Sequence, residues 1–169
     1  VRALMATPEN QKNLTAAIML VLRTGTYFIT DTHVKINPTP QQIANGTALV
    51  AKTMQNFGIE PKAALLSHSN FGSRQNKHAE KMQEALEIMH EEYPDVVVDG
   101  EMHADTALSQ EIRDRLTKES AFSGAANLLV CPSLNSGNIA YNMVKVLGDG
   151  IPVGPILVGT QYPAHIMSE

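Results

Sequence analysis

The sequence has little of what marks secreted, membrane-bound or nucleic-acid-binding proteins. Its single cysteine, Cys131, excludes an internal disulfide, so the cytoplasm is the expected location. The longest apolar run, residues 16–22, is far shorter than the roughly 20 residues that a membrane span needs, so no membrane is expected as a partner. The net charge is −4 and no Lys/Arg cluster stands out, which argues against nucleic acid as a partner.

The chain does contain enough apolar residues to build a core. Hydrophobic residues make up 43% of its 169 residues, and this length suits one compact domain. The sequence starts at Val1 rather than methionine, which favours a piece cut from a longer protein. We therefore expect residues 1–169 to be one domain, or a core with part of a second.

Helical and strand patterns alternate along the chain. Thr7 and Pro8 are typical of a helix start, and helical spacing of apolar residues then continues to Leu22. Strand patterns cover residues 27–34, 63–67, 96–98, 127–130 and 151–158. This alternation predicts a three-layer α/β domain with a largely parallel sheet.

Further helices are predicted between the strands. Thr39 opens a capping box with proline in the first turn, and Gly58 suits the end of that helix. Asp105 is expected to cap a helix of its own. The apolar positions that mark the later helices are Ala79, Met82, Leu86, Met89 and Tyr93, then Leu108, Ile112 and Leu116, then Ile139, Met143 and Leu147.

The expected ligand site lies beyond the carboxyl ends of the strands, where open α/β sheets bind their ligands. Four loops meet this condition, at residues 32–40, 67–73, 100–105 and 132–138, and all are rich in small polar residues. The amides and hydroxyls of residues 67–73 suit a phosphate at a helix N-terminus, or else an ordinary connection with capping serines. Residues 135–138 suit a hydrogen-bonded ligand, unless Ser133 or Asn135 simply caps the next helix.

Metal and nucleophilic chemistry are less favoured. Residues 99–105 hold three carboxylates and a histidine, but their spacing matches no standard metal motif. Ser67 and His68 are adjacent at a strand end and point to opposite faces, so they do not readily form a Ser–His pair. Cys131 is more naturally a buried, inert thiol than a reactive one.

Several segments, in their order, resemble the phosphate acetyl/butyryltransferase family: residues 30–34, 37–40, 64–73, 99–103, 126–130, 135–142 and 153–157. The likeness runs from about Tyr27 to the end of the chain. Free-standing transferases tend to have tyrosine where His68 stands, and leucine–glutamine where Met102 and His103 stand. The present variant is similar to the form fused behind malic enzymes.

The resemblance implies a fold similar to isocitrate and isopropylmalate dehydrogenases, in which two α/β domains flank a cleft. This chain would hold nearly all of the second domain and little of the first. In transferases the cleft binds CoA and phosphate. The positions that match the family's ligand site are Ser67, Asn70, Gly72, Ser73, Asn135, Gly137, Asn138, Gly154, Pro155 and Ser168.

The tail of the chain departs from the active family members, which resemble each other at Asp-Leu-Ser-Arg. The aligned residues here keep Ser168 but place Glu169 where the arginine would hold phosphate. An acid in place of a cation opposes phosphate binding. The resemblance thus implies a domain without catalytic residues or cofactors of its own.

Three functions follow as hypotheses from the resemblance. The first is a regulatory domain that binds acetyl-CoA or a related acyl-CoA, acts on malic enzyme catalytic domains in the same chain, and helps to assemble a homo-oligomer. Those catalytic domains would use NADP and a divalent metal, Mg or Mn. The second is an active phosphate acyltransferase, and the third is a purely structural oligomerisation domain.

Overall fold

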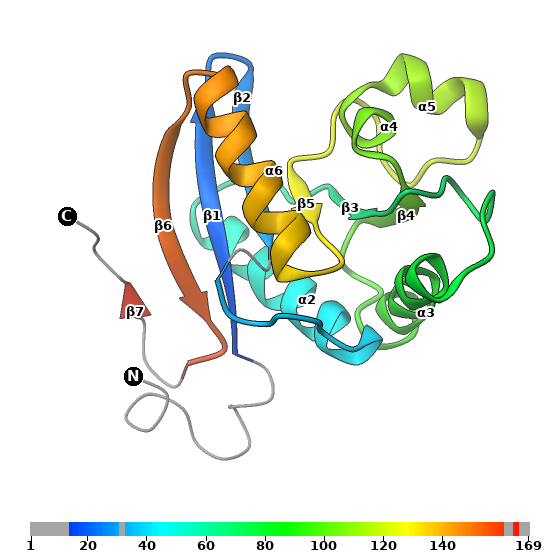
Figure 1. Cartoon of the computed structure of the whole chain (residues 1–169), viewed down its shortest axis with the longest axis horizontal. Helices are drawn as coiled ribbons and strands as arrows, with labels where there is room; N and C mark the ends of the chain where they lie inside the picture. The colour runs from blue at the N-terminus through cyan, green and yellow to red at the C-terminus, as the bar shows by residue number, and fades with distance from the viewer. Residues whose placement is uncertain (1–13, 31–32, 161–163, 166–169) are drawn as a thin grey trace.

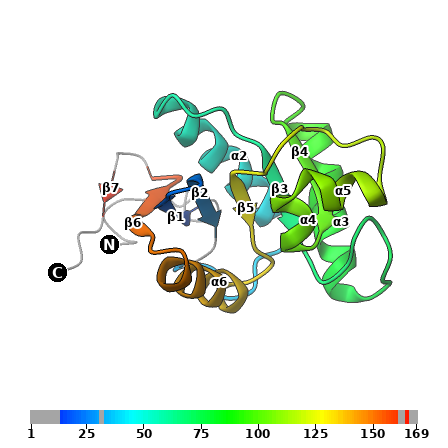
Figure 2. The same ribbon diagram turned by 90° about the horizontal axis from the view of Figure 1, so that it is seen from above.

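The computed structural model describes residues 14–30, 33–160 and 164–165, which form three layers (Figures 1 and 2). The strands of the middle layer are β1 (Thr15–Leu22), β2 (Gly25–Thr30), β3 (Ala63–Leu66), β4 (Val98–Met102), β5 (Leu128–Val130), β6 (Ile151–Val158) and β7 (Ala164–His165). The helices are α2 (Pro40–Asn56), α3 (Lys77–Glu92), α4 (Ala104–Leu108), α5 (Gln110–Leu116) and α6 (Leu134–Leu147). The predicted three-layer α/β domain is confirmed.

The described residues form a sheet of seven strands in the order β4-β3-β5-β2-β1-β6-β7. Strands β2, β5, β3 and β4 are parallel neighbours, so their carboxyl ends meet at one edge. Strand β1 pairs antiparallel with both β2 and β6, and β7 pairs antiparallel with β6. The parallel half is therefore the part of the sheet that gathers the predicted ligand loops.

The predicted helix up to Leu22 is wrong where it can be tested. Residues 15–22 form β1, and the chain turns back through Arg23 and Thr24 into β2, with Leu22 paired to Gly25. Strand β1 lies inside the sheet and both of its faces are covered, so nearly all its residues are apolar. A continuous apolar run satisfies helical spacing as readily as strand spacing. The helix start at Thr7 and Pro8 lies outside the described residues.

Two apolar cores hold the layers together, one on each face of the sheet. On one face, Ile43 and Met54 of α2 and Met82 of α3 pack against Phe28 and Leu65 of the sheet. On the other face, α4 and α6 cover the sheet, and their contributions are Ala107, Tyr141 and Val144. Figure 2 shows α2 and α6 on opposite sides of the strands.

The helix starts test the predicted caps. Thr39 Oγ1 accepts a bond from Gln42 N (3.3 Å) and Thr39 N donates to Gln42 Oε1 (3.1 Å), so the capping box is confirmed. Gly58 directly follows the C-cap residue Phe57 of α2 and has φ +74°, as predicted. Asp105, however, is not a cap: α4 begins after His103, and Ser109 ends α4 and caps α5. The single helix predicted over Leu108, Ile112 and Leu116 is therefore divided into α4 and α5. The division falls at Ser109, because Ser109 Oγ accepts a bond from the amide of Ile112 (3.3 Å) and so begins a new helix.

Helix α6 is present as predicted, but its marker residues lie on the exposed face. Ile139, Met143 and Val146 are more than half exposed, and Leu147 is 82% exposed. Ile151 and Val153 on the adjoining β6 are also exposed. Figure 1 shows α6 lying across the β1–β2 hairpin, with β6 on the other side of β1. In the described part of the chain, no helix is both long and apolar enough to cross a membrane.

Candidate functional site

A pocket of about 360 Å³ lies at the carboxyl ends of β3 and β5, where the fold predicts ligand binding. Helices α3, α4 and α6 begin around it, because each follows a strand of the parallel half. Its lining residues are Leu66, Ser67, His68, His78, Ala104, Cys131, Pro132, Ser136 and Ala140. None of them is a lysine or arginine, so only the two histidines can supply positive charge within this lining.

The loop of residues 67–73 borders the pocket through Ser67 and His68. Its backbone amides are already paired within the chain. Phe71 N donates to the carbonyl of Glu101 (2.7 Å), and Gly72 N donates to the carboxyl Oε1 of Glu101 (2.9 Å). The remaining bonds stay within the loop and its next residue. Ser69 N donates to Ser67 Oγ, and Asn70 N donates to Ser73 Oγ. Ser73 N donates to Asn70 O, and Arg74 N donates to Ser69 Oγ.

This pairing narrows how a ligand can bind the loop. The sequence suggested amides and hydroxyls as a phosphate cradle, and in the structure the amides from Ser69 to Arg74 donate to acceptors in the loop or to Glu101 of β4. Asn70 is also engaged, since its Oδ1 accepts a bond from His103 N (2.8 Å). The loop can therefore contact a ligand through side chains such as Ser67, and the predicted roles of Gly72 and Ser73 in binding stay predictions.

The start of α6 forms another side of the pocket. Ser133 is the helix cap: Ser133 Oγ accepts from Ser136 N (3.3 Å), and Ser136 Oγ accepts from Ser133 N (3.1 Å). Asn135 is exposed and Gly137 is buried. Asn138 Oδ1 accepts a bond from Asn142 Nδ2 (3.2 Å). Because Ser133 does the capping, neither Asn135 nor Asn138 is needed for that purpose.

The predicted site residues in β6 do not join this pocket. A Cβ at Gly154 would lie 2.7 Å from Ile156 N and 3.3 Å from Ala17 O, so this glycine permits close packing of β6 on β1. Pro155 is buried in the antiparallel half of the sheet. Neither residue lines the pocket at β3 and β5. Ser168 and Glu169 lie outside the described residues.

The carboxylates of residues 99–105 each have a structural partner. Asp99 Oδ2 accepts bonds from Ser120 Oγ (2.8 Å) and Ala121 N (3.0 Å), and Glu101 holds Gly72. Asp105 Oδ1 accepts from the amide of Thr106 (2.8 Å). Among the described residues no three His, Cys, Asp or Glu side chains are grouped so as to hold a metal ion.

Sequence reasoning missed several lining residues. His78 belongs to the first turn of α3 and lines the pocket together with Cys131, which is itself buried. The signal was available, because Cys131 directly follows a strand and Ser136 stands inside the predicted 135–138 segment. The ring Nε2 of His68 pairs with Asn76 Nδ2 (2.9 Å), while Ser67 Oγ serves its own loop. Ser67 and His68 are therefore each bonded to another group and do not form a Ser–His pair with one another.

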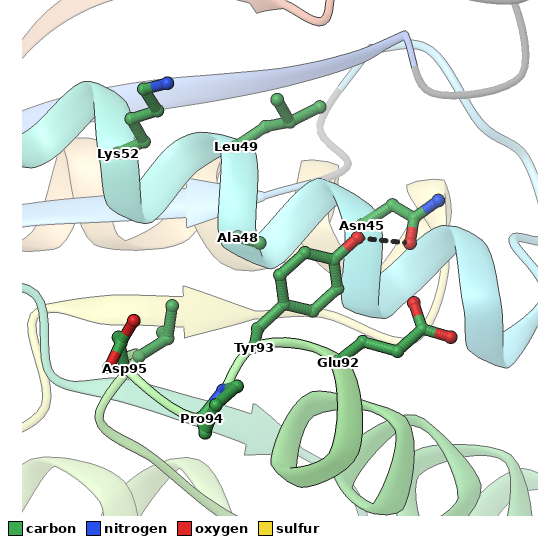
Figure 3. A pocket seen from close by; sticks show the side chains of 9 residues that line it. Asn45, Ala48, Leu49, Lys52, Glu92, Tyr93, Pro94 and Asp95 are labelled. Atoms are coloured by element: carbon green, nitrogen blue, oxygen red, sulfur yellow. Dashed lines mark hydrogen bonds between the residues drawn. The ribbon is translucent and has the colours of Figure 1, made fainter.

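A second pocket, of about 350 Å³, lies between α2 and the segment that follows α3 (Figure 3). Tyr93 stands between these elements and donates its hydroxyl to Asn45 Oδ1 (2.9 Å). Burial, followed by the charge of Glu92, raises the pKa of Tyr93 above its ordinary value of 10.0. Residues 93–96 lead into the amino end of β4, whereas ligand sites in such sheets lie at the carboxyl ends. The pocket at β3 and β5 is therefore the better candidate.

Comparison with known proteins agrees with this architecture. The chain is 46% identical over 156 residues to an NAD-dependent malic enzyme from Rhizobium meliloti, which covers 92% of the chain and 20% of that protein. It is 47% identical over 150 residues to an NADP-dependent malic enzyme from Salmonella typhimurium, covering 88% of the chain and 20% of that protein. The chain thus spans about a fifth of the length of these relatives.

The fold also matches a solved structure. A phosphotransacetylase from Streptococcus pyogenes superimposes with a TM-score of 0.84 at 37% identity, over 88% of this chain and 46% of that one. The family described as phosphate acetyl/butaryl transferase matches residues 1–169. Because that match extends over the whole sequence, the chain belongs to the phosphate acetyl/butaryl transferase family.

Proposed function

We propose that this chain is an acetyl-CoA-binding regulatory domain of an NADP-dependent malic enzyme, and that it contributes to the enzyme's oligomer. The observation that carries the proposal is the identity of 46–47% to two bacterial malic enzymes over about nine-tenths of the chain. The two relatives differ in their named nucleotide, and the choice of NADP rests on the Salmonella protein. Oxidative decarboxylation of malate, with NADP and Mg or Mn, would belong to parts outside this sequence.

The lining of the pocket supports binding rather than transfer. Moving an acetyl group between CoA and phosphate needs positive charge to stabilise the phosphate and the developing thiolate. The pocket at β3 and β5 offers His68 and His78 but no lysine or arginine. Hydroxyls such as Ser67 and Ser136 suit the polar atoms of a CoA ester, and Leu66 and Ala140 suit its apolar parts.

An active phosphate acyltransferase is the second candidate. The match of the transferase family to residues 1–169 and the likeness to a solved phosphotransacetylase favour it. Such a reaction needs no covalent enzyme intermediate, because positioning and charge stabilisation suffice. Acetyl-CoA formation from acetyl phosphate and CoA, assayed in the full-length protein, separates the two. Turnover of about 1–1000 per second would establish a transferase and contradict a purely regulatory domain.

The exposed apolar face of α6, formed by Ile139, Met143, Val146 and Leu147, supports the role in oligomer assembly. Water-exposed apolar side chains grouped in this way are typical of contact surfaces. Leu147→Asp should weaken self-association of the full-length protein, and light scattering coupled to size exclusion measures this. Leu116→Asp is the matched control, since Leu116 is half-exposed on α5, away from that face. An unchanged oligomer in Leu147→Asp would remove α6 from the assembly.

Binding of acetyl-CoA is the direct test of the regulatory proposal. A ligand present at about 100 times its dissociation constant stabilises the folded state by about 2.7 kcal/mol, which a thermal-shift titration detects. Asn138 belongs to α6 between the lining residues Ser136 and Ala140, so Asn138→Asp adds a negative charge near an anionic ligand and should weaken binding. Asn56→Asp, at the exposed end of α2, adds the same charge away from the pocket and should not. Absence of any shift at millimolar acetyl-CoA would leave only the structural role.

A further inference from the structure

Glu101 connects β4 to the loop of residues 67–73. Its side chain is buried, with only 2% of the residue exposed. The backbone carbonyl of Glu101 accepts from Phe71 N at 2.7 Å, and its carboxyl Oε1 accepts from Gly72 N at 2.9 Å. One residue of the neighbouring strand therefore holds two successive amides of the loop.

One of these two loop residues has a backbone that needs such support. Phe71 has φ +48° and Gly72 has φ +79°, both in the left-handed region, which glycine adopts freely. A bulky residue such as Phe71 costs about 1–3 kcal/mol there, so surrounding contacts must offset that cost. The contacts come from β4: Glu101 supplies two acceptors, and His103 N adds a third bond through Asn70 Oδ1 (2.8 Å). The shape of the loop thus depends on the strand beside it.

The carboxyl of Glu101 provides the acceptor for the amide of Gly72. A carboxyl oxygen that accepts an amide N–H at a turn makes the same kind of bond that a phosphate oxygen makes there. Gly72 N is consequently used inside the protein. A buried carboxyl is costly unless its oxygens find donors, so this pairing benefits both the loop and the strand.

We propose that Glu101 is a positioning residue for the ligand site: through Gly72 N it fixes the loop so that Ser67 borders the pocket at β3 and β5. The inference deepens the proposed function, on which its ligand-binding part rests. The structural part stands on the loop geometry alone. Glu101 acts through the loop and touches no ligand itself.

The same strand provides a matched control. Asp99 lies two residues before Glu101 on β4 and also accepts bonds from a backbone amide and a side chain. Its partners are the adjacent amide of Gly100 and, in the segment after α5, Ser120 and Ala121; none of them belongs to the ligand loop. Asp99→Leu therefore removes comparable acceptors from β4 without touching residues 67–73.

Amide hydrogen exchange of the full-length, ligand-free protein tests the structural part. Glu101→Leu removes the acceptor, and Glu101→Asp keeps a carboxyl but shortens it by one CH₂, so that it no longer reaches Gly72 N. Both should speed exchange in peptides covering residues 67–74 by about 10- to 100-fold, the loss expected for one hydrogen bond. Glu101→Gln keeps an oxygen at the same reach and should exchange like wild type. Asp99→Leu should speed exchange at residues 119–122 instead.

Affinity for acetyl-CoA in the same variants tests the ligand-binding part. Binding should weaken by about tenfold or more in Glu101→Asp and stay near wild type in Glu101→Gln and Asp99→Leu. Unchanged exchange at residues 67–74 in Glu101→Asp would overturn the positioning role. Equal losses of affinity in Asp99→Leu and Glu101→Asp would show that Glu101 supports the stability of the domain in general and has no specific role in positioning the loop. A wild-type protein that does not bind acetyl-CoA would instead contradict the proposed function, and the exchange result would still stand.

Discussion

Replacing Arg113 by methionine should destabilise the protein far more than replacing any exposed arginine. Arg113 is on α5, and its side chain is fully buried, with 0% exposure. Its guanidinium donates to Ser120 Oγ (2.9 Å) and lies over the ring of Phe122, 4.5 Å from the centroid. The remaining donors bind the carbonyls of Thr106 (3.1 Å), Ala107 (3.4 Å), Phe122 (3.2 Å) and Gly124 (2.7 Å).

The expected cost follows from these contacts. Hydrogen bonds to a charged group are each worth about 1.5–3 kcal/mol, and their losses do not add fully. Methionine fills most of the volume but donates no bond, so several buried carbonyls lose a donor. We expect a loss of about 3–5 kcal/mol in the free energy of unfolding, the range for breaking a buried charged network. With an m-value of about 1–3 kcal/mol/M, the urea midpoint falls by at least about 1 M.

Arg115→Met provides the control on the same helix. Arg115 is exposed and pairs with Glu111 one turn away, an arrangement worth about 0.5 kcal/mol or less. Urea denaturation of wild type and both variants, followed by circular dichroism, gives the comparison. Equal midpoints for Arg113→Met and Arg115→Met would refute the reasoning, because burial and the carbonyl contacts would then contribute nothing.

Two further predictions concern a helix cap and a tyrosine. Thr39→Ala should cost about 1 kcal/mol in urea denaturation by removing the cap of α2, and Thr39→Ser should restore most of it. The pKa of Tyr93 is raised by burial and by Glu92, so wild type should lose stability as the pH rises above about 10. Tyr93→Phe has no group that titrates at this position, so the difference in free energy of unfolding between wild type and Tyr93→Phe should shrink as the pH rises. A difference that stays constant with pH would contradict this prediction.

The sequence predicted the layers of this fold better than its first element. Local chemistry is readable: the capping box at Thr39 and the left-handed Gly58 both follow from neighbouring residues. Strand β1 was mistaken for a helix because a strand covered on both faces shows no alternation. Its antiparallel pairing with β2 and β6 identifies it as a strand. The pairing with β6 joins residues far apart in the sequence, so a short stretch of sequence cannot predict it.

The candidate site divides in a similar way. The loops at the carboxyl ends of β3 and β5 were predicted, and of the residues singled out there Ser67 lines the pocket, whereas Asn135, Gly137 and Asn138 are not among its lining residues. What the sequence did not reveal is how Glu101 uses the loop amides, because that contact joins residues 29 positions apart. The predicted roles of Gly154 and Pro155 came from resemblance alone, and the structure gives both residues packing roles in β6.

We propose that acetyl-CoA binds this domain and lowers malate turnover by other parts of a full-length malic enzyme. A ligand can regulate only if it binds one global state better than another. The measurement is the rate of malate oxidation by the full-length enzyme against acetyl-CoA concentration, for wild type and Asn138→Asp. We expect inhibition of wild type and an inhibition curve shifted to higher acetyl-CoA concentration in the variant, with equal rates when acetyl-CoA is absent. A wild-type rate that does not change with acetyl-CoA would contradict it.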